Sequence, residues 1–263
     1  MNGHITRRTA IRNVAAAAAI SGGLRDISAG NAPAIQCAAE RRPKLIAFDV
    51  IETLFDPSPV EAALTDLGLP AGSLKVWFPR FLRDAFALEI AGEYQTFREI
   101  ATASLKVLCR GHELDPGDAR IDAVLATFAK LPAHPDVRAG FEAVRAAGVR
   151  MITLTNGSAG VTRKMLANAD LDGFIERSIS IDEIKHWKPA KAVYLHAART
   201  MQVEPREIAM VAAHDWDTAG ASRAGLITGG VERANAFSTA LPPPDVISAT
   251  LPETVKLLLA LPV

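Results

Sequence analysis

Three short apolar runs, each ending in polar residues, constrain the fold of this chain more than any other feature of its sequence. They span residues 44–48, 149–154 and 208–213. Continuous apolar runs of this length are typical of strands that are buried on both faces of a parallel sheet. Because the segments between them carry helical patterns, the sequence predicts an α/β fold whose core is a Rossmann-like, doubly wound parallel sheet.

The helices expected around this sheet follow from apolar residues at helical spacing. They span residues 135–147, 158–169, 189–201 and 218–224. In a sheet of this kind, ligands bind beyond the carboxyl ends of the strands. The polar residues at those ends are therefore predicted to share one edge of the sheet; they are Asp49, Thr155, Asn156 and His214.

The alternation of strand and helix breaks between the first two predicted strands. There the sequence indicates helices with no strand between them, for example over residues 77–91 and 94–108. We interpret residues 58–132 as an inserted helical cap over the carboxyl edge of the sheet. The core domain is then made of residues 43–57 and 133–263.

The first residues differ from the rest of the chain. Arg7 and Arg8 precede a mildly apolar, alanine-rich run from Val14 to Ile20. A charged start, a short apolar run and a small-residue exit are the three parts of a secretion signal. We predict that residues 1–42 form a twin-arginine signal peptide and leader, which would place the protein in the periplasm. A disordered basic leader or a misassigned start codon is the alternative, and the protein would then be cytoplasmic.

Charge and cysteine content exclude several classes of function. The 29 basic and 29 acidic residues balance, so no long-range field favours a polyanion, and we expect no nucleic-acid partner. The apolar run in the leader is too short to span a bilayer, and we expect no stable membrane association. The two cysteines, Cys37 and Cys109, lack the spacing of a zinc site. We expect neither a disulfide, nor a metal, nor another cofactor.

Four motifs at the predicted strand ends carry the chemistry. The first places Asp49 directly after a buried run and Thr53 four residues later; alone, this pair is as typical of a helix cap. Three more motifs follow in order: Leu154-Thr155-Asn156-Gly157-Ser158, Ile184-Lys185-His186-Trp187-Lys188-Pro189 and Val211-Ala212-Ala213-His214-Asp215-Trp216-Asp217. Together the four motifs, over about residues 44–230, resemble those of the haloacid dehalogenase superfamily.

This resemblance implies a role for each motif. Asp49 would attack the substrate. Thr53 would position the Asp49 carboxylate, and Lys188 would neutralise the charge of that carboxylate. The resemblance assigns substrate binding to Val50, Ile51, Thr155, Asn156 and Tyr194. Asp217 would hold Lys188 or position water; its alternative is an N-cap for the following helix.

Two positions favour displacement of halide over phosphoryl transfer. Phosphatases of this superfamily carry an acid two residues after the nucleophile, and it protonates the leaving oxygen; here the residue is Ile51. Their magnesium-binding acid falls at Ala212. A halide needs neither a proton nor a metal in order to leave. The chain thus resembles the type II (S)-2-haloacid dehalogenases, which convert 2-haloalkanoic acids to 2-hydroxy acids through an ester on the aspartate.

The chain departs from that dehalogenase pattern in its cap. The resembled enzymes carry a halide-binding arginine soon after a cap tryptophan, whereas Trp77 is followed by Phe78. We expect Arg80 or Arg83, one or two turns along the helix, to replace it, unless both are surface charges.

The fourth motif also departs from the pattern. His214 stands where those enzymes have asparagine, and Glu52 directly precedes Thr53. We predict that His214, oriented by Glu52, activates the hydrolytic water, as the resemblance to a branch of that family implies; the alternative is local capping by both. We expect Trp216 to pack in the core.

Two other functions stay open. One is an atypical phosphatase or phosphonatase of the same superfamily. The other is a small-acid binding protein that keeps the fold without turnover. The expected partners are a 2-haloacid substrate and water, and the resemblance also implies a homodimer.

Overall fold

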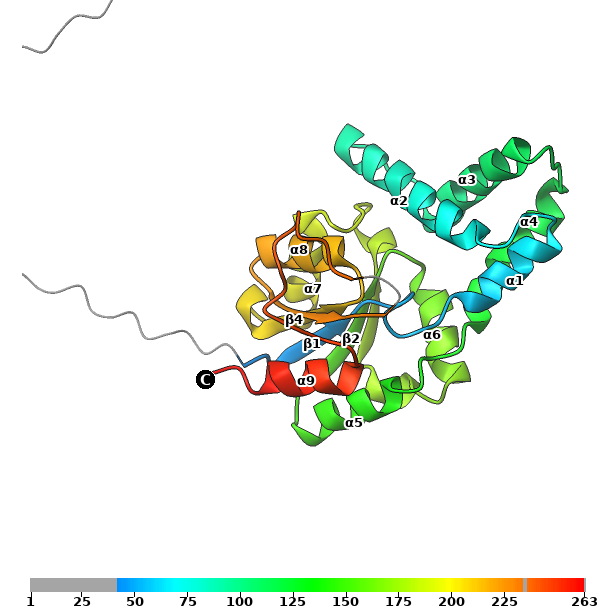
Figure 1. Cartoon of the computed structure of the whole chain (residues 1–263). Coiled ribbons are helices and arrows are strands. Elements are labelled where there is room, and N and C mark those ends of the chain that lie inside the picture. Colours follow the sequence, from blue (N-terminus) through cyan, green and yellow to red (C-terminus); the bar gives the residue numbers. More distant parts are fainter. Residues whose placement is uncertain (1–41, 234–235, 263) are drawn as a thin grey trace, which may run out of the picture. The chain divides into compact units, whose positions relative to one another are not determined.

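The computed structural model describes residues 42–233 and 236–262, and the predicted leader lies outside them except for Arg42. Its centre is a six-stranded sheet in which all neighbouring strands are parallel, with the order β3-β2-β1-β4-β5-β6 (Figure 1). The strands are β1 (Leu45–Phe48), β2 (Arg150–Thr155), β3 (Arg177–Ser180), β4 (Ile208–Ala212), β5 (Ile227–Val231) and β6 (Val246–Ser248). The predicted α/β class with a parallel sheet is confirmed.

Strand β1 lies in the middle of the sheet, and all four of its side chains are fully buried. It pairs with β2 on one side and β4 on the other, with Leu45 opposite Arg150 and Ile208. The ladder continues one residue further, since the N–H of Asp49 donates to the carbonyl of Val211 at 2.9 Å. Asp49 is therefore fixed at the carboxyl edge by a strand that is paired on both sides.

Helices cover both faces of the sheet. Helices α5 (Val137–Ala146) and α9 (Leu251–Leu259) pack side by side on one face, and α7 (Lys191–Met201) and α8 (Asp215–Arg223) lie on the other (Figure 1). Helix α6 (Ala159–Asn168) connects β2 with β3. Because both faces are covered, the central strands can be uniformly apolar.

Between β1 and α5, the described chain contains helices and no strand. They are α1 (Ser58–Asp66), α2 (Ser73–Ala91), α3 (Phe97–Gly111) and α4 (Gly117–Ala126), followed by a 3₁₀ turn over Thr127–Lys130. These helices have an apolar centre of their own, in which the Trp77 ring packs 6.2 Å from Phe128 and its N–H donates to Ser104 at 2.8 Å. None of the described helices is long and apolar enough to cross a membrane.

The loop before α7 is held against this helical insertion. The Glu89 carboxylate of α2 accepts hydrogen bonds from the Trp187 N–H at 2.8 Å and from His186 Nδ1 at 2.9 Å. The Trp187 indole N–H donates to the Gln95 carbonyl at 3.0 Å, and its ring meets Phe81 edge-on. Trp187 thus fixes the loop that carries the next residue, Lys188.

Gly220 of α8 is where this loop and the helix approach most closely. A Cβ there would lie 2.6 Å from Pro189 Cβ and 2.7 Å from the Tyr194 hydroxyl. Gly220→Ala should lower the free energy of unfolding by about 1–3 kcal/mol, because the packed groups must shift, and should reduce turnover by displacing Lys188. Urea denaturation measures the change. Gly111→Ala is the control, since a Cβ at that position meets nothing within 4 Å; equal stabilities of the two variants would contradict the prediction.

Candidate active site

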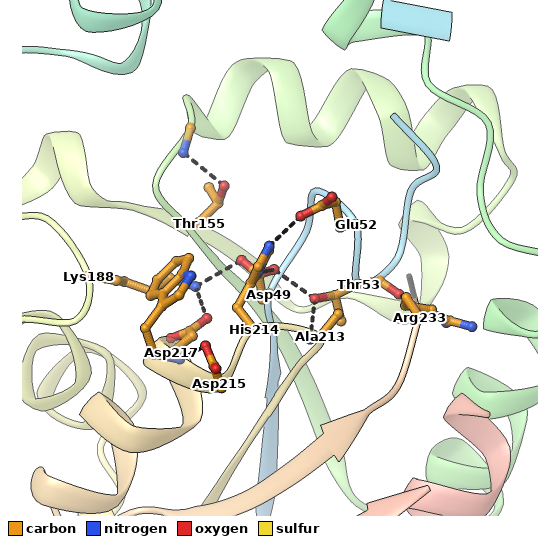
Figure 2. A network of polar contacts seen from close by, with 12 residues as sticks. Asp49, Glu52, Thr53, Thr155, Lys188, Ala213, His214, Asp215, Asp217 and Arg233 are labelled. Carbon is orange, nitrogen blue, oxygen red and sulfur yellow. Dashed lines mark hydrogen bonds and ion pairs between the residues drawn. The ribbon is translucent and has the colours of Figure 1, made fainter. Parts of the chain in front are cut away.

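Side chains from the ends of β1, β2 and β4 and from the loop before α7 meet around Asp49 (Figure 2). Asp49 is 6% exposed, and each oxygen of its carboxylate accepts a hydrogen bond. Lys188 Nζ donates to Oδ1 at 3.0 Å, and the Thr53 hydroxyl donates to Oδ2 at 2.7 Å. Thr53 Oγ1 itself accepts from the Ala213 N–H at 2.9 Å, and this directs its proton to Asp49.

Lys188 lies wholly buried between two carboxylates. Besides Asp49 it contacts Asp217 Oδ2 at 2.7 Å, and the Tyr194 hydroxyl donates to the other oxygen of Asp217 at 2.7 Å. Burial lowers the pKa of Lys188, but Asp217 and Asp49 outweigh this and raise it. Tyr194, predicted to bind substrate, is placed instead as a fully buried partner of Asp217.

The Asp49 carboxyl is held ionised by its neighbours. Burial alone raises its pKa, but Lys188 and then His214 and Thr53 more than reverse this, and the pKa falls well below its ordinary value. For Asp217, burial prevails over Lys188 and the pKa is raised. The attacking group expected from the sequence is therefore an anion at neutral pH.

The structure brings His214 and Glu52 together. His214 Nε2 lies 2.6 Å from Glu52 Oε2, and its other ring nitrogen lies 3.3 Å from Asp49 Oδ2. The second contact is not aligned as a hydrogen bond, so Nδ1 is buried without one. Burial lowers the pKa of His214, but Asp49 and Glu52 raise it to about 10. The imidazole between the two carboxylates is therefore a cation at neutral pH.

Two aromatic rings lie nearly parallel to this imidazole. Trp216 stacks on it with ring centroids 4.9 Å apart, and Phe78 of α2 lies 6.4 Å away; Phe86 of α2 meets Trp216 edge-on at 5.3 Å. The expectation that Trp216 packs in the core is wrong, because it is only half-buried and borders the site. Sequence reasoning missed Phe78, although its place after Trp77, where an arginine was expected, was a signal.

The other predicted binding groups lie around Asp49. Thr155 Oγ1 accepts from the Gly157 N–H at 2.9 Å, which leaves its own proton to donate elsewhere. Asn156 Oδ1 accepts from the Lys188 N–H at 2.9 Å and thus ties the second motif to the third. Within the described part of the chain, the N–H groups of Val50 and Ile51 make no backbone hydrogen bond. These two N–H groups are donors available to a bound carboxylate.

Neither predicted arginine is brought to Asp49. Arg83 is exposed and pairs with the adjacent Asp84 at 2.7 Å. Arg80 lies two residues after Phe78, about 200° around the helix, and so on the opposite side of α2 from the ring that borders His214. Arg80 does lie about one helical turn after Trp77. The side of α2 that faces the core, however, carries Phe78 and Phe86.

Over residues 42–233 and 236–262, no three His, Cys, Asp or Glu side chains gather so that they could hold a metal ion. The position of the magnesium-binding acid in phosphatases is taken by the fully buried Ala212.

Comparison with known proteins identifies the family of this chain. Residues 43–225 match a family model described as haloacid dehalogenase-like hydrolase. The chain is 30% identical over 190 residues to (S)-2-haloacid dehalogenase 1 of Pseudomonas sp. (strain CBS-3), covering 72% of this chain and 84% of the relative. It is 27% identical over 188 residues to (S)-2-haloacid dehalogenase 4A of Burkholderia cepacia, covering 71% and 81%.

Among solved structures, a dehalogenase in an intermediate complex superposes with a TM-score of 0.75 at 25% identity, covering 82% of this chain and 97% of that one. The L-2-haloacid dehalogenase of Xanthobacter autotrophicus with chloropropionic acid covalently bound has the same fold, with a TM-score of 0.76 at 21% identity over 83% and 99% of the two chains. The chain belongs to the haloacid dehalogenase-like hydrolase family.

The position of His214 between two carboxylates predicts its protonation state. ¹⁵N-histidine NMR should find it protonated at pH 8, and Asp49→Asn should lower its titration midpoint because one of the two anions is gone. Since its pKa is raised to about 10 from an ordinary 6.5, the stability it adds is complete below pH 6.5 and is lost as the pH rises towards 10.

Loss of one signal in His214→Gln assigns the resonance. His134, which faces a backbone carbonyl, serves as the internal control. A neutral His214 at pH 7.5 in the unaltered protein, or an unchanged midpoint in Asp49→Asn, would contradict the prediction.

Proposed function

We propose that this protein is a hydrolytic dehalogenase that converts short 2-haloalkanoic acids to 2-hydroxy acids through an ester on Asp49. The observation that carries the proposal is the Asp49 carboxylate, held ionised by Lys188 and Thr53. Ile51 and Ala212 stand where phosphoryl transfer would need acids. Relatives named as (S)-2-haloacid dehalogenases support this choice of substrate.

In the first step, one Asp49 oxygen attacks the carbon that bears the halogen, and the halide leaves with the bonding electrons. The substrate brings its own carboxylate close to Asp49, and the cations Lys188 and His214 offset that repulsion. Thr155 and the N–H groups of Val50 and Ile51 are the donors for the substrate carboxylate. The product of this step is a neutral ester on Asp49.

A protonated His214 cannot accept a proton from water, so the first step must also prepare the base for the second. Ester formation removes the negative charge of Asp49, one of the two protein anions that hold the proton on His214, while the substrate carboxylate stays bound by Thr155 and the N–H groups of Val50 and Ile51. We infer that His214 then releases this proton to solvent. The general base is thus formed only once there is an ester to hydrolyse.

In the second step, neutral His214, oriented by Glu52 at 2.6 Å, takes a proton from water while the oxygen attacks the Asp49 ester carbonyl. The bond from the Asp49 carbonyl carbon to the alkyl oxygen breaks, and that oxygen takes up the second proton of the attacking water and leaves as the hydroxyl of the 2-hydroxy acid. Asp49 is again a carboxylate and His214 is again an imidazolium. The cycle consumes one haloacid and one water and yields one hydroxy acid, one halide and one proton.

Metal dependence separates this function from that of an atypical phosphatase. Halide release from chloro- or bromoacetate, measured with an ion-selective electrode, should be unchanged in excess EDTA, since a halide needs no metal in order to leave. A generic phosphate ester should not be hydrolysed. Loss of halide release in EDTA with recovery in Mg²⁺ would instead favour the phosphatase, and no release from any haloacid would favour a binding protein.

Single-turnover kinetics separates the two steps. Asp49→Ala should release no halide, because the nucleophile is absent. His214→Ala should release about one halide per active site and then stall, with a substrate-derived ester on the Asp49 peptide in mass spectrometry. Steady turnover by His214→Ala at the rate of the unaltered enzyme would exclude His214 as the base.

A further inference from the structure

The turn after β1, residues 50–55, contains a residue in an unfavourable backbone conformation. Glu52 has a φ of 66°, in the left-handed region that favours glycine. Such residues persist only where their surroundings hold them, and they cluster at functional sites. In this conformation the Glu52 carboxylate reaches His214 at 2.6 Å. The strained residue is therefore the one that orients the predicted base.

Three successive backbone carbonyls of this turn accept hydrogen bonds from residues outside the turn. His134 Nε2 donates to the Glu52 carbonyl at 3.0 Å, and the His134 backbone N–H donates to the Leu54 carbonyl at 2.9 Å. Between them, Arg233 Nη2 donates to the Thr53 carbonyl at 3.0 Å. Figure 2 shows Arg233 beside Thr53. Neither His134 nor Arg233 forms a hydrogen bond or ion pair with Asp49. Because both bond only backbone carbonyls of the turn, the Glu52 and Thr53 side chains contact His214 and Asp49.

One of these two groups, Arg233, is itself fixed by an ion pair. Arg233 forms a two-pronged ion pair with Asp136, with both N–O distances 2.9 Å, and the side chains are 13% and 18% exposed. Asp136 also accepts from the Leu251 N–H at 2.8 Å, at the start of α9. Burial and the nearby Arg233 lower the pKa of His134, so it is neutral at pH 7 and its Nε2 carries a proton.

We propose that His134 and Arg233, the latter braced by Asp136, are positioning residues that hold Glu52 in its left-handed conformation and so aim its carboxylate at His214. The proposal rests on the proposed function, and it places their effect in the second step. Asp49 is held by Lys188 and by the Thr53 side chain, so the first step should proceed without them.

The kinetic test uses His134 in the full chain with 2-chloropropionate. His134→Ala should keep the first burst of halide but lower steady turnover about tenfold or more, with the ester accumulating on Asp49. His134→Gln should recover most of the turnover, because its amide can donate to the Glu52 carbonyl. Arg233→Lys keeps a cation beside Asp136 but loses the planar guanidinium that bonds both Asp136 and the Thr53 carbonyl. This variant should accumulate ester as well. Turnover without ester accumulation in His134→Ala would overturn the proposal.

A second measurement reports the held conformation without any turnover. Glu52→Gly and Glu52→Ala both remove the carboxylate, but only glycine adopts a positive φ freely. The glycine variant should melt about 2–4 °C above the alanine variant. In the His134→Ala background this difference should shrink, because the turn can relax. An undiminished difference there, or no difference in the first place, would overturn the proposal.

The two measurements keep the failures of the two proposals apart. If the unaltered protein releases no halide from any haloacid, the proposed function fails, while the melting comparison still tests the hold on Glu52. If the unaltered protein turns over and His134→Ala behaves identically, the positioning role fails and the dehalogenase function stands.

Discussion

The rest of the site depends on the buried ammonium of Lys188. Taking an ammonium out of water costs several kcal/mol unless partners of opposite charge surround it, and removing one partner leaves a charge that nothing compensates. Here the partners are Asp49, at the end of β1, and Asp217, on α8. Trp187 fixes the same loop to α2 of the insertion through the hydrogen bond from its backbone N–H to the Glu89 carboxylate. Lys188 and its neighbour Trp187 thus couple the central strand, a helix on one face and the inserted helices, so displacing any of them disturbs Asp49.

The charges around Asp49 explain why His214 suits the proposed two-step reaction. Three carboxylates, Asp49, Glu52 and Asp217, meet only two cations in this network. Lys188 keeps its proton throughout, since it is buried between two of the anions. His214 is the group whose protonation can follow the charge of Asp49, because it is 13% exposed and an imidazole titrates closer to neutral pH. A fixed cation at this position, such as arginine, would offset the same repulsion but could never become a base.

Sequence patterns predicted what depends on one strand or one motif, and missed what depends on packing between elements. Apolar runs located β1, β2 and β4, but β5 contains Gly229 and Gly230, which favour no strand. These glycines are required because a Cβ would come within 2.9 Å of Leu258 and 2.8 Å of Phe237. The edge that carries Asp49 followed from strand order. Which side of α2 faces the core could not be predicted, because it is decided only when the helix packs against the core. Arg233 follows a strand that was not predicted, so no motif indicated it.

The phenylalanines that α2 presents to the core change how the site handles charge. With Phe78 and Phe86 beside His214 and Trp216, the insertion contributes apolar surface next to the catalytic groups. The cations that offset the substrate carboxylate then come from the core, on loops fixed by the sheet. Apolar cover lowers the local dielectric, so each of these charges acts more strongly on its neighbours. The same cover makes His214 more sensitive to the loss of the Asp49 charge, and the proposed coupling between the two steps depends on that sensitivity.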